Sequence, residues 1–159
     1  MIIEYDSKYD EQIKDLLVEL QNYLIDIDDW HTQVMLPKYR ENIFKMDMNK
    51  VRKQNGKIYL SLENNIVIGL VIGIVEEKDE IDKITNDCAK TGSILELIVK
   101  NNIRGNGIGK SLLEKMEEYF KSINCKRINI EVFGPNVKGL NFYEKNSYVI
   151  RDIIVSKRI

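Results

Sequence analysis

Three glycines alternate over residues 105–109, with Arg104 before them and Lys110 and Ser111 after them. They follow the apolar residues 94–99 and lead into a segment with helical periodicity. A glycine-rich turn that leads into a helix exposes free backbone N–H groups at the positive end of the helix dipole. Such a turn typically binds phosphate or pyrophosphate. This segment therefore predicts a phosphate-bearing ligand.

Two other phosphate-binding loops contain similar residues and must be separated from this one. The Walker A loop has the pattern Gly-x-x-x-x-Gly-Lys-Ser/Thr, and Gly109, Lys110 and Ser111 match its end. Arg104 stands where that loop has its first glycine. The dinucleotide fingerprint Gly-x-Gly-x-x-Gly places its third glycine one residue later than Gly109. A nucleoside triphosphatase is therefore disfavoured, although it stays a competing hypothesis.

A third pattern, Arg/Gln-x-x-Gly-x-Gly/Ala, is matched by Arg104, Gly107 and Gly109. On these residues the sequence resembles the GNAT superfamily of acetyl-CoA-dependent N-acetyltransferases. The resemblance extends to the apolar residues 97–99, which match the end of the family's fourth strand. It also extends to residues 136–148, which resemble the family's segment Asn-x-x-Ala-x-x-x-Tyr-x-x-x-Gly-Phe. Two motifs in the right order are more specific than one glycine loop.

Three residues depart from the family's pattern. Asn101 stands where proline is common, Gly139 where alanine is common, and Ser147 where a glycine precedes the aromatic residue. We expect Asn146 to supply the left-handed turn that ends the helix before Ser147. None of these changes affects a residue expected to carry out chemistry.

The resemblance implies one N-acetyltransferase domain of the α/β class over residues 1–159. We expect a central mixed, twisted sheet of six to seven strands with helices on both faces. Two parallel strands of this sheet, residues 94–99 and 127–132, should splay apart and hold acetyl-CoA between them. A long apolar strand at residues 66–75 independently predicts helices on both faces, because such a strand is covered on both sides.

Hydrophobic periodicity predicts the remaining elements. Strands are expected at residues 2–5, 57–63, 66–75, 94–99, 127–132 and 148–156. Helices are expected after Ser7 as an N-cap, with Pro37 in the first turn of the second helix, from Asn106 and after Asn136. Residues 76–91 are rich in charge and should form a long loop with a short helical turn.

The resemblance also assigns residues to the site. It implies that acetyl-CoA is bound by Leu97, Ile98, Val99, Arg104, Gly105, Asn106, Gly107, Ile108, Gly109, Lys110, Asn136 and Tyr143. Arg104 either contacts the phosphates or orients the loop, and Lys110 is either a phosphate partner or a solvated lysine. Asn136 would bond the pantetheine arm, cap the following helix, or do both.

Direct transfer of an acetyl group to an amine needs a base and an acid. An alkyl amine has a pKa of about 10 and must lose a proton before it attacks, whereas the leaving thiolate is stabilised by a proton donor. Tyr143 fills the family's position for that donor. Its alternative role is structural: the ring would pack a short helix onto the sheet and take no part in the reaction. Glu96 is the candidate base, directly or through a water, because a carboxylate among apolar neighbours is costly to bury. It could instead be a structural residue at a strand edge.

The acceptor is expected to be a primary amine of a small molecule or a peptide. Asp29, Trp30 and His31 lie in a polar segment that interrupts the apolar spacing of the first expected helix. They could bind a cationic amine, with Trp30 offering a cation–π face, or they could form only a turn between two helices. The loops at residues 76–91 and 133–135 should complete the acceptor pocket. The alternative to an enzyme is a non-catalytic acetyl-CoA-binding module with the same fold.

Composition limits the partners. A net charge of −1 argues against nucleic acid, and the longest apolar run, of about ten residues, is too short to cross a membrane. Cys88 and Cys125 lack CxxC spacing, which favours a reduced, cytoplasmic protein. We expect no metal and no membrane partner, and these expectations leave room for a homodimer.

Overall fold

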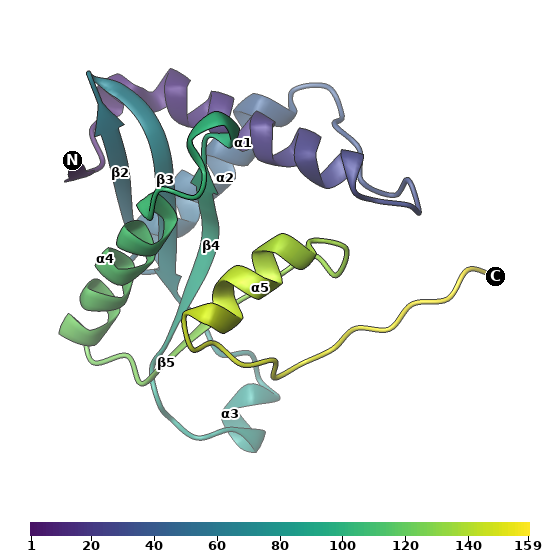
Figure 1. The fold of residues 1–159 in the computed structure, drawn as a ribbon. Helices are drawn as coiled ribbons and strands as arrows, with labels where there is room; N and C mark the ends of the chain where they lie inside the picture. The colour runs from purple at the N-terminus through teal and green to yellow at the C-terminus, as the bar shows by residue number, and fades with distance from the viewer.

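The computed structural model describes residues 1–159 and contains one five-stranded sheet (Figure 1). The elements in chain order are β1 (Ile2–Glu4), α1 (Asp10–Asp26), α2 (Tyr39–Lys53), β2 (Lys57–Glu63), β3 (Ile66–Val75), α3 (Asp82–Thr85), β4 (Thr91–Val99), α4 (Ile108–Ser122), β5 (Arg127–Ile130) and α5 (Val137–Lys145). The strands lie in the order β1-β2-β3-β4-β5. The mixed α/β class is confirmed, with five strands instead of six or seven.

The sheet is antiparallel from β1 to β4 and parallel between β4 and β5. The parallel pairing covers only residues 91–94 of β4 and 127–130 of β5. The rest of β4, residues 95–99, continues along β3 without a partner on the β5 side. The two parallel strands therefore diverge, as expected, and leave backbone groups of β4 free on that side.

Helices cover both faces of this sheet (Figure 1). On one face α1 and α2 pack over a core that includes Ile13, Leu17 and Leu70. On the other face α4 packs through Met116 and Phe120. Each of these buried side chains contributes about 1.5–3 kcal/mol relative to full exposure, so the two cores hold the sheet between the helices.

A β-bulge interrupts β4 next to the point where the strands diverge. Ile72 of β3 pairs with Glu96, whereas the next residue, Gly73, pairs with Ile94, so Leu95 is an extra residue. As a result Ile94 packs in the α4 core, whereas Ile98 packs in the α1–α2 core. A regular strand would place both isoleucines on the same face, because they are four residues apart. The bulge was not predicted from the alternation of residues 94–99.

Several predicted boundaries were wrong. Asp6, and not Ser7, caps the first helical segment, because its carboxylate accepts a hydrogen bond from the N–H of Lys8. Pro37 lies before α2, which begins at Tyr39.

The short helical turn expected within residues 76–91 is present as α3. No helix of the structure is long and apolar enough to span a membrane.

The end of the chain also differs from the prediction. Residues 148–156 form no strand, and residues 149–159 are exposed throughout. The left-handed residue after α5 is Ser147, with φ of 69°, whereas Asn146 has φ of −102°. Asn146 instead donates a hydrogen bond from its side chain to the carbonyl of Phe142. The expected turn is thus present one residue later.

Candidate active site

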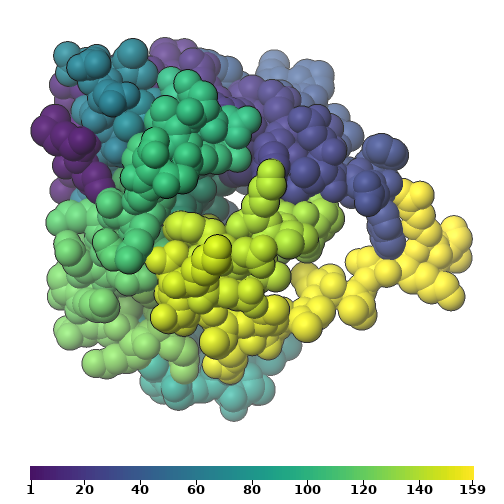
Figure 2. Space-filling model, in the orientation of Figure 1, coloured from purple at the N-terminus to yellow at the C-terminus, as the bar shows by residue number.

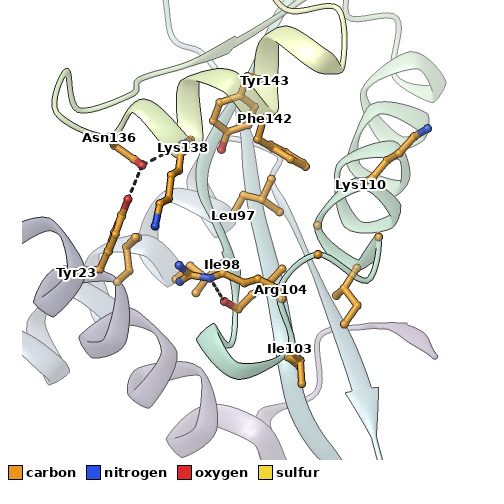
Figure 3. A pocket seen from close by; sticks show the side chains of 17 residues that line it. Tyr23, Leu97, Ile98, Ile103, Arg104, Lys110, Asn136, Lys138, Phe142 and Tyr143 are labelled. Atoms are coloured by element: carbon orange, nitrogen blue, oxygen red, sulfur yellow. Dashed lines mark hydrogen bonds between the residues drawn. The ribbon is translucent and has the colours of Figure 1, made fainter. Parts of the chain in front are cut away.

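A cavity of about 390 Å³ lies where β4 diverges from β5 (Figure 3). Its walls come from α1, the end of β4, the glycine-rich loop, the start of α4, and α5. Of the residues expected to bind acetyl-CoA, all except Asn106 line it. The lining residues are Leu20, Tyr23, Leu97, Ile98, Val99, Ile103, Arg104, Gly105, Gly107, Ile108, Gly109, Lys110, Asn136, Lys138, Gly139, Phe142 and Tyr143. The structure therefore brings two distant sequence motifs to one cavity.

The glycine-rich loop owes two of its glycines to backbone conformation. Gly105 has φ of 89° and Gly107 has φ of 78°, a left-handed region that costs other residues about 1–2 kcal/mol. A Cβ at either position would meet no atom within 4 Å, so crowding within the chain is not the reason for glycine. Gly107 precedes α4, where the N–H of Ser111 is bonded to the carbonyl of Gly107. The first N–H groups of α4 thus stay free for an anion.

Arg104 ties this loop to the end of β4. Its Nε donates a hydrogen bond of 2.9 Å to the carbonyl of Val99. Its guanidinium also lies 5.5 Å from the centre of the Tyr23 ring, within the range of a cation–π contact. Both contacts orient the loop against β4 and α1. The guanidinium still lies in the cavity wall, where its charge favours an anionic ligand.

Asn136 caps α5 and links it to α1. Its Oδ1 accepts hydrogen bonds from the N–H of Gly139 at 3.0 Å and from the hydroxyl of Tyr23 at 3.1 Å (Figure 3). A Cβ on Gly139 would lie 2.5 Å from the amide nitrogen of Asn136. Glycine at the position where alanine is common therefore leaves room for this cap.

Two lysines of the cavity differ in where they point. The Lys110 side chain extends away from the cavity (Figure 3), and its ammonium lies 3.8 Å from Glu114 on the surface of α4. Lys138, which the sequence analysis did not single out, extends from α5 into the cavity between Tyr23 and Ile98 (Figure 3). Lys138 is thus the lysine whose charge faces the cavity, whereas Lys110 contributes its backbone.

Tyr143 is held in the cavity wall by other aromatic rings. Its ring centre lies 5.3 Å from Phe142 and 5.8 Å from Tyr148, both in edge-to-face arrangements. Burial, and then the nearby charge of Glu96, raise the pKa of Tyr143 above its ordinary value. The hydroxyl therefore keeps its proton at neutral pH and can act as a donor. The packing role and the donor role are compatible.

Glu96 follows the extra residue of the bulge. Burial, and then the charge of Asp47, raise the pKa of Glu96 to about 8, against a smaller opposite effect of Lys50. Desolvation dominates because an ionised carboxylate loses its hydration there. A carboxylate with this pKa is a base matched to neutral or slightly alkaline conditions.

Asp47 of α2 is a second carboxylate that the sequence analysis missed. Only 4% of it is exposed, and its Oδ2 has no hydrogen-bond partner. Burial raises the pKa of Asp47 to about 6, and Lys50 opposes this shift. The charges of Glu96 and Asp47 both raise the pKa of Tyr39, after burial. The available signal was its spacing, since Asp47 lies three and four residues after Phe44 and Ile43 on the buried face of α2.

Six further residues line the cavity and were not predicted to belong to the site: Leu20, Tyr23, Ile103, Lys138, Gly139 and Phe142. Tyr23 lies three residues after Leu20 on α1, and both residues line the cavity. Helical spacing from Leu16 and Leu20 could have identified it. Nothing in the local sequence indicates that Lys138 turns inward.

The residues proposed from the polar break lie elsewhere. Asp29, Trp30 and His31 are exposed in the connection between α1 and α2 and do not line the cavity. The adjacent Asp28 is buried and accepts backbone hydrogen bonds from Trp30, Thr32 and Gln33. These bonds, led by that from Gln33, lower the pKa of Asp28 to about 2. Asp28 thus fixes the turn, while a substrate role for its neighbours stays a prediction.

A second, open hollow of about 460 Å³ lies beside the end of α2. It is lined by Lys50, Gln54, Ile74, Glu76, Glu77 and Asp82. Three of its lining residues are carboxylates from the segment 76–91, from which an acceptor pocket was expected. Lys50, whose charge acts on Glu96 and Asp47, also lines this hollow.

Comparisons with known sequences identify a family and several relatives. The sequence model of the Acetyltransferase (GNAT) family matches residues 19–148. Glucosamine 6-phosphate N-acetyltransferase 1 of Dictyostelium discoideum is 25% identical over 142 residues, which cover 83% of this chain and 86% of that protein. An uncharacterized N-acetyltransferase of Methanocaldococcus jannaschii is 41% identical over 64 residues, or 40% of this chain and 41% of that protein.

Solved structures share the fold. A mutant of a Bacillus halodurans protein is similar with a TM-score of 0.79 and 16% identity, over 100% of this chain and 99% of that one. A protein of Clostridium acetobutylicum, described as a predicted acetyltransferase and solved with acetyl-CoA, has a TM-score of 0.72 and 19% identity. The match covers 99% of this chain and 95% of that protein. Likeness at these identities shows the fold alone.

Proposed function

This chain belongs to the GNAT family of acetyltransferases, and we propose that it transfers the acetyl group of acetyl-CoA directly to a primary amine of a small molecule or a peptide. The observation that carries this proposal is the single cavity between the glycine-rich loop and Tyr143, at the divergence of β4 and β5. The glycine-rich loop, as the proposed phosphate site, and Tyr143, as the proposed proton donor, both line this cavity. Acetyl-CoA supplies the activated acyl group as a thioester.

The residues of the cavity fit the parts of acetyl-CoA. The free N–H groups at the start of α4 and the left-handed glycines 105 and 107 suit a pyrophosphate. The charges of Arg104 and Lys138 are of the right sign for its phosphates. The unpaired side of residues 95–99 offers backbone groups to the amide-containing pantetheine arm, as an added strand would use them.

We propose that Glu96 accepts the proton of the incoming ammonium and that Tyr143 donates a proton to the leaving sulfur. A base with a pKa near 8 is ionised to a useful extent at slightly alkaline pH and is basic enough to take a proton from an amine. Tyr143 is protonated under the same conditions. Asp47 makes Glu96 more basic, because its negative charge disfavours a second charge nearby.

We propose that the acceptor approaches from the acidic hollow and carries positive charge beyond its reacting amine. Glu76, Glu77 and Asp82 would attract a polyamine or an aminoglycoside and repel a phosphate group. Two of the relatives are named for glucosamine 6-phosphate, which is an amine with a phosphate. The hollow thus favours a cationic acceptor in this chain over that compound.

The test is an amine panel incubated with acetyl-CoA and followed by release of free thiol. The panel contains polyamines, aminoglycosides, peptides with free amines, and glucosamine 6-phosphate. Thiol release that depends on one class of amine is expected. If no amine supports thiol release while calorimetry shows that acetyl-CoA binds, the chain is a binding module and not an enzyme. Tight binding of ATP without binding of acetyl-CoA would contradict the proposal altogether.

A further inference from the structure

Tyr23 of α1 connects the glycine-rich loop to α5 across the cavity. Its ring lies 5.5 Å from the guanidinium of Arg104 in the loop, and its hydroxyl donates a hydrogen bond of 3.1 Å to Oδ1 of Asn136 before α5 (Figure 3). Figure 2 shows the yellow-green side chains of α5 reaching the violet-blue end of α1, in agreement with this bond. Tyr23 therefore belongs to the cavity, although it lies 113 residues before Asn136 in the sequence.

Glu19, one turn before Tyr23, fixes the position of α1 against the glycine-rich loop. Its Oε1 accepts a hydrogen bond of 2.8 Å from the backbone N–H of Asn101. Proline, which is common in the family at this position, has no N–H and could not make this bond. Residues four apart lie on the same face of a helix, so Glu19 and Tyr23 together dock one face of α1 on the walls of the cavity.

The hydrogen bonds of Asn136 decide which end of its amide is available to a ligand. Oδ1 accepts from the N–H of Gly139 at 3.0 Å and from the hydroxyl of Tyr23 at 3.1 Å, which uses both of its lone pairs. A backbone N–H donates only to an acceptor, so the bond from Gly139 also identifies the oxygen end of the amide. Nδ2 makes no hydrogen bond, and Asn136 lines the cavity. The group that Asn136 leaves for a ligand is therefore a donor.

Gly139 makes this orientation of Asn136 possible. A Cβ on residue 139 would lie 2.5 Å from Nδ2 and 3.0 Å from Oδ1 of Asn136. The alanine that is common in the family at this position would thus push the amide out of place. The departures from the family's pattern at Asn101 and Gly139 both support the contact of α1 with the cavity.

We propose that Tyr23 is a positioning residue for acetyl-CoA, which holds Asn136 so that Nδ2 donates a hydrogen bond to an amide carbonyl of the pantetheine arm. A carbonyl oxygen accepts and cannot donate, so it requires the free donor that Nδ2 provides. Without the hydroxyl of Tyr23, the amide of Asn136 loses one of the two bonds that orient it, and the cofactor binds less tightly. This inference rests on the proposed binding of acetyl-CoA.

Calorimetry with acetyl-CoA and with ADP, which has a pyrophosphate but no pantetheine arm, tests this role. Tyr23→Phe should raise the Kd for acetyl-CoA roughly two- to tenfold, the range expected for one hydrogen bond between uncharged groups, and should leave the Kd for ADP unchanged. The matched control is Tyr5→Phe, because the Tyr5 hydroxyl also bonds to a residue of α1, Asp10, but outside the cavity. An unchanged Kd for acetyl-CoA in Tyr23→Phe, or equal losses for both ligands, would overturn the proposal.

A double-mutant cycle shows whether Tyr23 acts through Asn136. Asn136→Asp keeps an oxygen for the N–H of Gly139 and remains a good N-cap, but it replaces the donor Nδ2 by an oxygen. It should raise the Kd for acetyl-CoA by about tenfold or more, with the fold retained by thermal unfolding. Adding Tyr23→Phe to this variant should cause little further loss, because the group that Tyr23 positions is already gone.

The outcomes separate this inference from the proposed function. Losses that add fully in the double variant would show that Tyr23 does not act through Asn136 and would refute the inference. Binding of acetyl-CoA by the wild type that neither single variant weakens would refute the inference alone. A wild type that does not bind acetyl-CoA would refute the proposed function as well.

Discussion

At the scale of single residues, the site combines two carboxylates and a tyrosine whose protonation depends on their neighbours. Glu96 and Tyr143 were proposed from the sequence, by motif position and by the cost of a charge among apolar residues. Asp47 could not be proposed in the same way, because its effect depends on the packing of α2 over the bulge of β4. No spacing in the sequence relates residue 47 to residue 96.

Tyr143→Phe should lower the maximal rate and leave the affinity for acetyl-CoA almost unchanged. The ring and its contacts with Phe142 and Tyr148 are kept, and only the proton donor is lost. Loss of a general acid costs about 10²–10⁴-fold in rate. Steady-state thiol release and calorimetry with acetyl-CoA measure the two effects. Tyr119→Phe is the control, because Tyr119 of α4 does not line the cavity and its hydroxyl bonds to the carbonyl of Asn55; an equal rate in both variants would remove Tyr143 as the acid.

Glu96→Gln should abolish the rise of the rate with pH that is expected around pH 8. Only the ionised carboxylate can accept a proton, so the wild-type rate increases as pH rises through the pKa of Glu96. The amide cannot titrate, and its rate should be lower by about 10²–10⁴-fold. A profile of kcat/KM against pH checks this. Glu63→Gln at the end of β2 is the control, and the same alkaline rise in the Glu96 variant would exclude Glu96 as the base.

Asp47→Asn should move the midpoint of that pH profile to lower pH and should stabilise the fold at pH 8. The shift follows because Asp47 raises the pKa of Glu96. Stability follows because the folded protein holds the proton of Asp47 up to a pKa of about 6, whereas the unfolded chain loses it near 3.8. The free energy of unfolding therefore falls as pH rises between these values, by about 3 kcal/mol for two pKa units.

Urea denaturation at pH 3.5 and pH 8 measures this effect of Asp47. The variant should be about 1–3 kcal/mol more stable than the wild type at pH 8, and the two should converge at pH 3.5. A variant that is less stable at pH 8 would show that the buried carboxylate has a partner that the structure does not include.

At the scale of elements, the glycine-rich loop and the start of α4 form the proposed phosphate site. Their type and order could be predicted, because the glycines, the apolar run before them and the helical period after them are all local signals. The bulge in β4 could not be predicted, since an extra residue in a strand is defined only against its partner, β3.

Gly107→Ala should weaken binding of acetyl-CoA. At φ of 78° a Cβ costs about 1–2 kcal/mol, and relief of this strain would turn the first N–H groups of α4 out of place. We expect about a tenfold higher Kd by calorimetry, with the overall fold retained by circular dichroism. Gly134→Ala is the matched control, because this loop glycine also has no atom within 4 Å of an added Cβ but is not left-handed. Equal affinities in the two variants would contradict the role of the loop.

At the scale of the whole molecule, the sheet of five strands lies between two cores and has β1 and β5 as its edge strands. The layers could be predicted, because α1 and α4 carry clear apolar faces and β3 is apolar throughout. The missing strand at residues 148–156 could not. Strand propensity states what a segment prefers when it has a partner strand, and no strand of the sheet pairs with this segment in the structure.

The bulge at Leu95 also matters for how this chain is compared with its relatives. Ile94 and Ile98 pack on opposite faces of the sheet only because the extra residue Leu95 lies between them. Without it, both isoleucines would contribute to the same core. A one-residue gap placed here in an alignment would therefore not trim a loop. It would shift the residues after Ile94 by one position and so assign them to the wrong face of the sheet. It would also align Glu96 of this chain with the wrong residue of a relative.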